Sequence, residues 1–181
     1  MNFKFNVNLT EQDYINFNKF HILKSDFGKK TNKHFKIIII VLLIIATIIT
    51  FIMNGIKVGI AGLLVFSLIG ILTLLLTDKF LFLSTAATVK SLKKTGKLPY
   101  SPSSVVEFDE EGYIESNETE KNERKYSVIE NVTVSEEYTA VYVFVSSASA
   151  VILPYSAFKS REELFAFIEF MKTKCSKVVY L

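Results

Sequence analysis

The sequence predicts an α+β membrane protein, in which a two-helix transmembrane hairpin is joined to an antiparallel sheet capped by a C-terminal helix. Two apolar runs, 37–53 and 58–77, contain no ionisable side chain. Short strand-like segments follow between Val105 and Pro154, and an amphipathic helix begins after Ser160. These three observations divide the chain into a membrane part and a part with its own core.

Each apolar run is long enough to cross a bilayer as a helix. About twenty helical residues match a hydrocarbon core of roughly 30 Å, and in lipid only a helix or a closed barrel satisfies the backbone. Residues 54–57 are too few for more than a turn between the runs. The second run has small residues on one helical face, which allow close antiparallel packing: Gly59, Gly62, Gly70, Thr73 and Thr77. Glycine is also common in membrane helices without such pairing, so both interpretations stay open.

Charge predicts the orientation of this hairpin. Only Lys57 lies between the apolar runs, whereas lysines crowd both outer flanks: Lys19, Lys24, Lys29, Lys30, Lys33 and Lys36 before them, and Lys79, Lys90, Lys93, Lys94 and Lys97 after them. The positive-inside rule then places both termini in the cytoplasm of a multi-pass cell-membrane protein. A single cysteine, Cys175, fits a reducing compartment.

Residues 1–36 are too short to fold alone. Phe3, Phe5 and Val7 alternate with polar residues, which predicts a half-buried strand. Thr10 and the acidic residues after it predict a helix start, and Gly28 its end before the bilayer. The helix is expected to turn aromatic residues toward an apolar surface: Tyr14, Phe17, Phe20 and Phe27. Because one strand needs a partner sheet, we expect 1–36 to pack on the C-terminal domain.

Residues 78–99 are predicted to form a membrane-proximal helix and linker, with Gly96 as the helix stop. The cytoplasmic domain then covers 100–181. Its strands alternate with turns, with a polar crossing over 117–124 and a central strand over 138–145 that is apolar on both faces. The expected strands are 105–108, 113–116, 130–134, 138–145 and 150–154.

The last helix has the clearest start signal in the chain, because Ser160 and Glu163 have the spacing of a capping box. Its apolar stripe is expected to cover one face of the sheet and contains Leu164, Ile168, Met171 and Cys175, widened by Phe165 and Phe167. An antiparallel sheet closed by one C-terminal helix is the layout of a pleckstrin-homology-like domain, an analogy of fold alone.

Two blocks resemble a known family. Residues 9–25 (LTEQDYINFNKFHILKS) and 124–158 (RKYSVIENVTVSEEYTAVYVFVSSASAVILPYSAF) are similar to the YcxB-like family of small bacterial membrane proteins. The resemblance implies the hairpin between the blocks and a YcxB-type C-terminal domain, and it implies no activity. Val128 stands where members have tryptophan, and Tyr155 and Ser156 stand where they have basic residues, which weakens the idea of an acidic-ligand site beside Pro154.

The sequence gives no catalytic, cofactor-binding or metal-binding residues. His21 and His34 lie outside any metal or nucleophile pattern, and we expect them to be packing or headgroup-level residues. Cys175 completes an apolar stripe, so burial is favoured over reactivity. An acidic group is best explained as a solvated turn: Glu107, Asp109, Glu110, Glu111 and Glu115.

The apolar runs favour an anchor, because transporters place ionisable residues within the membrane. We therefore expect a membrane-anchored cytoplasmic binding or regulatory module without catalytic activity. Its expected partners are the lipid bilayer and either a protein or a second copy bound through the hairpin, and no nucleic acid. The alternatives are a membrane-surface enzyme acting on a lipid or envelope substrate, and an oligomeric pore.

Overall fold

The computed structural model describes residues 2–147 and 149–181. The chain is divided into two compact units. The sheet unit comprises Met1–Asn18 and Val89–Leu181, and the helical unit comprises Lys19–Thr88. In chain order the elements are β1 (Phe3–Asn8), α1 (Glu11–Leu23), α2 (Asp26–Lys94), β2 (Ser103–Phe108), β3 (Gly112–Ser116), β4 (Lys121–Lys125), β5 (Asn131–Ser135), β6 (Ala140–Ser146), β7 (Ser149–Pro154), α3 (Arg161–Lys174) and β8 (Val178–Tyr180).

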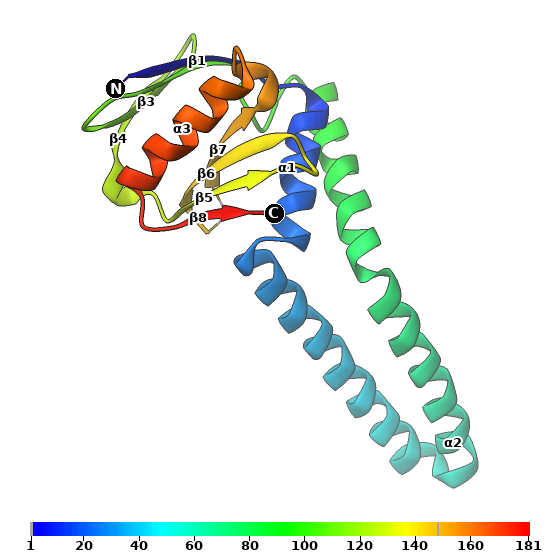
Figure 1. Ribbon diagram of the computed structural model, residues 1–181. Coiled ribbons are helices and arrows are strands. Elements are labelled where there is room, and N and C mark those ends of the chain that lie inside the picture. The colour runs from blue at the N-terminus through cyan, green and yellow to red at the C-terminus, as the bar shows by residue number, and fades with distance from the viewer. Residues whose placement is uncertain (1, 148) are drawn as a thin grey trace. The chain divides into compact units, whose positions relative to one another are not determined.

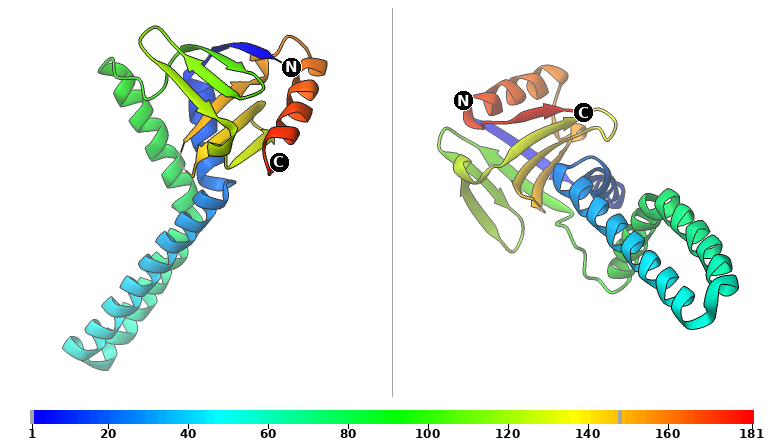
Figure 2. Two further views of the ribbon diagram at one scale, coloured as in Figure 1. Left: turned by 90° about the vertical axis from the view of Figure 1, so that its left-hand side faces the viewer. Right: turned by 90° about the horizontal axis from the view of Figure 1, so that it is seen from below.

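The first sheet joins the chain segments on either side of the helical unit. Its strand order is β1-β2-β3-β4, and all neighbours are antiparallel. β1 pairs with β2 so that Phe3 lies opposite Phe108 and Phe5 opposite Val106, although the helical unit separates these strands in sequence. The prediction that Phe3, Phe5 and Val7 join the C-terminal sheet is confirmed, since their strand β1 lies beside β2 (Figure 2). All three side chains are buried.

The prediction of a polar crossing over 117–124 is wrong in its second half, because β4 begins there at Lys121. Lys121–Lys125 forms an edge strand that pairs with β3 along its whole length. All of its side chains are exposed, so its sequence carries no alternating pattern from which a strand could be predicted. Backbone hydrogen bonds to β3 fix this strand, and the polar side chains keep it soluble as a sheet edge.

The second sheet has the order β7-β6-β5-β8. β6 is the inner strand that its apolar sequence predicts, and Ala140 to Phe144 are buried. β8, which was not predicted, pairs parallel with β5. The start of α1 packs here, because Phe17 lies 5.4 Å from Tyr142 between ring centroids.

α3 closes the core between the sheets (Figure 1). Half of the predicted capping box is present, since Ser160 Oγ accepts from the Glu163 backbone N–H at 3.3 Å. Glu163 Oε2 reaches back one residue further than predicted and accepts from the Lys159 N–H at 2.6 Å. Phe167 is fully buried, and its ring centroid lies 5.4, 5.1 and 4.9 Å from those of Phe3, Phe5 and Phe108. The prediction that Phe165 widens the apolar stripe is wrong, since that side chain is 60% exposed.

α2 changes direction at Gly55, whose φ of 76° and ψ of 179° interrupt the helical geometry. Two arms result, 26–54 and 56–94, which lie side by side in Figure 1. Small residues of the second arm face the first: a Cβ on Gly59 would lie 2.2 Å from the Phe51 ring, and one on Gly70 would lie 3.3 Å from Leu43. These contacts favour the close-packing interpretation of the predicted small-residue face.

The junction of α1 and α2 differs from the prediction. α1 ends at Leu23, and α2 begins at Asp26, so Gly28 starts a new helix and does not end the first one. Ser25 Oγ caps α2 by accepting from the Gly28 N–H at 2.9 Å. A Cβ on Gly28 would lie 1.9 Å from the carbonyl oxygen of His21, so only glycine fits this close turn.

Candidate functional site

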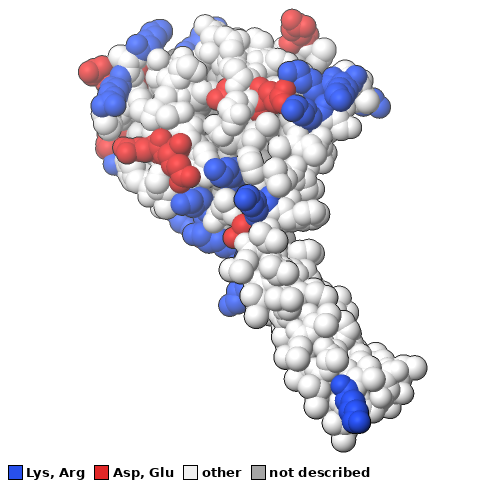
Figure 3. Space-filling model, turned by 90° about the vertical axis from the view of Figure 1, so that its right-hand side faces the viewer, with Lys and Arg blue, Asp and Glu red and all other residues white. Residues whose placement is uncertain are grey.

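The arms of α2 have an apolar surface that nothing covers within the described residues. None of the most apolar window of this helix is buried, and the helix is long and apolar enough to cross a membrane by length and composition. Exposed side chains include Ile52, Leu64 and Leu75, and on the face in Figure 3 the arms carry no charge between their two ends. So large an apolar surface marks contact with lipid or with protein.

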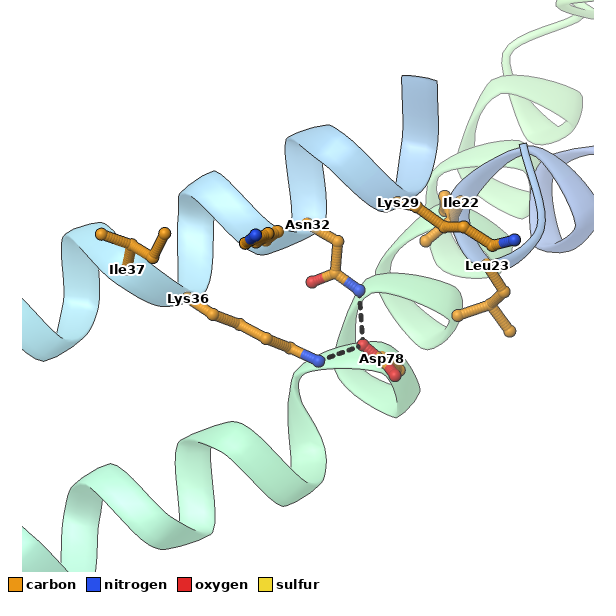
Figure 4. Close-up of a pocket in the computed structure, with 8 residues that line it drawn as sticks. Ile22, Leu23, Lys29, Asn32, Lys36, Ile37 and Asp78 are labelled. Carbon is orange, nitrogen blue, oxygen red and sulfur yellow. Dashed lines mark hydrogen bonds and ion pairs between the residues drawn. The ribbon is translucent and has the colours of Figure 1, made fainter. Parts of the chain in front are cut away.

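Polar side chains connect the arms at the end of this apolar surface. Asp78, on the second arm, accepts hydrogen bonds from two residues of the first arm: Asn32 Nδ2 at 2.5 Å and Lys36 Nζ at 2.9 Å (Figure 4). The hydrogen bond from Asn32, together with that from Lys36, lowers the pKa of Asp78 below its ordinary value. The carboxylate is therefore charged at neutral pH and joins the arms as an acceptor.

Beside this cluster lies a pocket of about 320 Å³, the basic pocket, lined by Ile22, Leu23, Lys29, Asn32, Lys33, Lys36, Ile37 and Asp78. Lys29, Lys33 and Lys36 follow one another at spacings of four and three, which places them on one helical face. The pocket lining thus contains three lysines and one carboxylate. Within the described part of the chain no ion pair is present at Lys29 or Lys33. The arrangement is suited to binding an anion.

From the sequence, the lysines of the basic pocket were recognised only as part of the positively charged flank before the first apolar run. Their helical spacing was available as a signal, but Asp78 lies 42 residues from Lys36. Only the reversal of the chain at Gly55 brings these residues together.

A second hollow, of about 510 Å³, lies on the sheet unit between α3 and the β7-β6-β5-β8 sheet. Its polar residues include Glu136, Tyr155 and Arg161, and the remainder is mainly apolar. Burial raises the pKa of Tyr155. Tyr155 adjoins Pro154, the position where the resemblance suggested a family-specific basic patch.

Neither His21 nor His34 is among the residues that line the two hollows. His21 stacks on Phe27, with ring centroids 5.7 Å apart, and burial lowers the pKa of its imidazole. His34 lies on α2 with Nδ1 2.7 Å from the carbonyl oxygen of Lys30. Among the described residues, no group of three or more His, Cys, Asp or Glu side chains is placed so that it could hold a metal ion.

Cys175 is half-buried at the end of α3 and packs against the core. Burial raises the pKa of its thiol to about 11, so the reactive thiolate is scarce at neutral pH.

Asp109, Glu110 and Glu111 form a turn, as predicted, whereas Glu107 and Glu115 lie in β2 and β3, and burial raises the pKa of Glu115. Asp109 accepts from the backbone N–H groups of Glu111 and Gly112 at 2.8 and 2.9 Å. Its neighbours are used in separate ion pairs: Glu107 with Lys4, and Glu110 with Lys174, each at 2.6 Å. The contact with Lys174 lowers the pKa of Glu110 to about 2. These carboxylates serve the local structure of the strand ends.

Comparison with known proteins identifies the class of domain. Residues 108–171 match the family model described as YcxB-like protein. The chain therefore contains a YcxB-like domain that runs from the end of β2 into α3. The resemblance stated for 124–158 lies inside this range and is confirmed, whereas 9–25 lies outside it. No curated protein and no solved structure matches the chain.

Proposed function

We propose that this protein is a membrane-anchored cytoplasmic binding or regulatory module without catalytic activity. In this proposal α2 is a transmembrane hairpin that crosses the cell membrane twice, over 37–53 and 58–77, and both termini are cytoplasmic. One observation carries the proposal: the arms expose apolar side chains throughout, and their charged residues are confined to the ends. Water would penalise such a surface, whereas lipid would not.

The dimensions and charges of the arms support two crossings. At about 1.5 Å per residue, 37–53 and 58–77 extend roughly 26 and 30 Å, close to the thickness of a hydrocarbon core. The Asp78–Lys36 pair follows directly outside these segments, where water and headgroups can solvate it. Lysines accumulate at that same end and only Lys57 lies at the turn, which supports a cytoplasmic position for the lysine-rich end.

The sheet unit supplies the binding part of the proposal. The antiparallel pairing of β1 to β4, the antiparallel pairing of β5 to β7 and the closing helix α3 support the proposed pleckstrin-homology-like layout. The hollow beside α3 is lined mainly by apolar side chains and can receive a protein segment or a membrane component. Because fold alone does not define a ligand, the hairpin is the stronger part of this proposal.

Single-cysteine labelling tests the proposed transmembrane hairpin and its orientation. In a Cys175→Ser background, cysteines are introduced one at a time by Asn54→Cys at the turn, Lys30→Cys at the lysine-rich end and Glu118→Cys in the sheet unit. All three sites are exposed. A membrane-impermeant maleimide applied to intact cells should label position 54, and positions 30 and 118 only after permeabilisation. Labelling of 54 and 118 from the same side, or release of the protein by alkaline carbonate without detergent, contradicts the proposal.

A further inference from the structure

We infer that the basic pocket binds the phosphate and hydroxyl groups of an anionic phospholipid headgroup, of which phosphatidylglycerol is the chemical type. This inference rests on the proposed transmembrane hairpin, since that hairpin sets the pocket at the level of the headgroups. The pocket volume of about 320 Å³ lies in the range of ligand-binding cavities.

Uncompensated positive charge is the first support. Lys36 is engaged by Asp78, and no ion pair is present at Lys29 or Lys33 within the described residues. A phosphate group accepts hydrogen bonds from ammonium groups, and Lys29 and Lys33 both line the pocket as donors of this kind. Basic pockets between membrane helices on the cytoplasmic side are sites of this kind.

Asn32 is the second support, because it offers an acceptor that the protein does not use. Its Nδ2 donates to Asp78, as Figure 4 shows, while its Oδ1 is buried and has no hydrogen-bond partner among the described residues. A buried amide oxygen without a donor is unfavourable. A headgroup hydroxyl would supply the donor, and the lysines would bind the phosphate beside it.

The apolar wall of the pocket favours a lipid over a soluble phosphate. Ile22, Leu23 and Ile37 line it together with the lysines. Ile37 is also the first residue of the uncharged segment, so the pocket opens where acyl chains begin in the proposed topology. A ligand with a charged head and an apolar body matches both kinds of lining.

Lipid binding to the full-length protein in detergent tests the inference by native mass spectrometry. The probes are phosphatidylglycerol, phosphatidylcholine with the same acyl chains, and glycerol 1-phosphate. The pocket variant Lys29→Gln/Lys33→Gln is compared with Lys30→Gln/Lys79→Gln, which removes the same charge at the same end of the arms but from outside the pocket lining.

The wild-type chain should bind one phosphatidylglycerol at least about tenfold more tightly than phosphatidylcholine. The pocket variant should lose about thirtyfold in affinity, and the control variant less than about threefold, since a lysine close to an anionic headgroup contributes far more than a distant one. Equal losses in both variants would indicate general surface charge and overturn the inference. So would equal binding of the two lipids, or glycerol 1-phosphate binding as tightly as phosphatidylglycerol.

The hydroxyl contact has its own test with phosphatidylmethanol, which carries the same charge and no headgroup hydroxyl. Phosphatidylglycerol should bind about threefold or more tightly than this lipid, and Asn32→Ala should remove the difference. Equal binding of both lipids to the wild-type chain contradicts the role of Asn32. Cysteine labelling of the same variants separates the two proposals. If positions 30, 54 and 118 are labelled as predicted but the protein shows no preference for phosphatidylglycerol, only the lipid site is contradicted. If the labelling differs from the prediction, the transmembrane hairpin is contradicted.

Discussion

At the scale of single residues, the close turn between α1 and α2 depends on residues whose role is visible only in three dimensions. Gly28 is one, since its position against the His21 carbonyl leaves no room for a Cβ. His21 is another, because its ring is partly buried against Phe27 in the same turn. The two residues together determine how α1 is followed by α2.

Gly28→Ala should destabilise the helical unit by about 1–3 kcal/mol, because the clash at 1.9 Å involves backbone, which cannot rotate away. Gly70→Ala is the matched control within α2, as its Cβ would meet only the Leu43 side chain at 3.3 Å. Thermal unfolding of both variants in detergent measures the difference. A midpoint for Gly28→Ala equal to that of the control would show that the turn is not tightly packed.

His21 should make stability depend on pH. Burial lowers its pKa in the folded chain, so the unfolded chain takes up a proton at a higher pH than the folded one. Stability is therefore complete above the ordinary value of about 6.5 and decreases as the pH falls through it toward the folded-state pKa. The drop in unfolding temperature between pH 7.5 and pH 5 should be smaller in His21→Gln than in the wild type, and an unchanged drop contradicts this account.

At the scale of elements, α3 shows how one helix face can be predicted in outline and still be wrong at one position. The spacing of Leu164, Ile168 and Met171 predicted the buried stripe, and all three are buried. Phe165 was assigned to that stripe by its apolar character, but its angular position on the helix turns it to solvent. Phe170 is buried in its place.

Phe167→Ala and Phe165→Ala form a matched pair on this helix. Phe167 is fully buried among the aromatic rings of β1 and β2, so its truncation should cost about 3–5 kcal/mol. Phe165 is exposed, and its truncation should change stability by less than about 0.5 kcal/mol. Chemical denaturation monitored by tyrosine fluorescence compares them. Similar losses of stability in both variants would contradict the burial of the Phe167 face of α3 against the core.

At the scale of the whole molecule, the sequence predicted the features that follow from the apolar pattern of a segment, or from the need of a single apolar strand for a partner sheet. The apolar runs, the buried strand β6 and the joining of β1 to the C-terminal sheet were all expected. β4 and β8 were missed because they form through backbone pairing with neighbouring strands. The sequence of β4 also has no apolar alternation that would predict a strand. The basic pocket was missed because Lys36 and Asp78 meet only through the reversal at Gly55.

The sheet unit should fold without the helical unit, provided that β1 is present. A chain in which a flexible linker replaces 19–88 keeps both parts of this unit, whereas 89–181 alone leaves the buried edge of β2 uncovered. The linked chain should unfold cooperatively, because Phe3, Phe5 and Val7 complete the core. The shorter chain should lack a cooperative transition, and equal behaviour of the two would mean that β1 is dispensable.

Depth measurement in a bilayer tests the central claim, that lipid surrounds the arms of α2. Spin labels are attached in the Cys175→Ser background at Phe35→Cys, Ile45→Cys, Asn54→Cys and Leu68→Cys, all exposed positions. In reconstituted protein, collisions with oxygen relative to those with a water-soluble nickel complex should be greatest at 45 and 68 and lower at 35 and 54. A ratio at 45 and 68 no higher than at 35 and 54 would contradict the account.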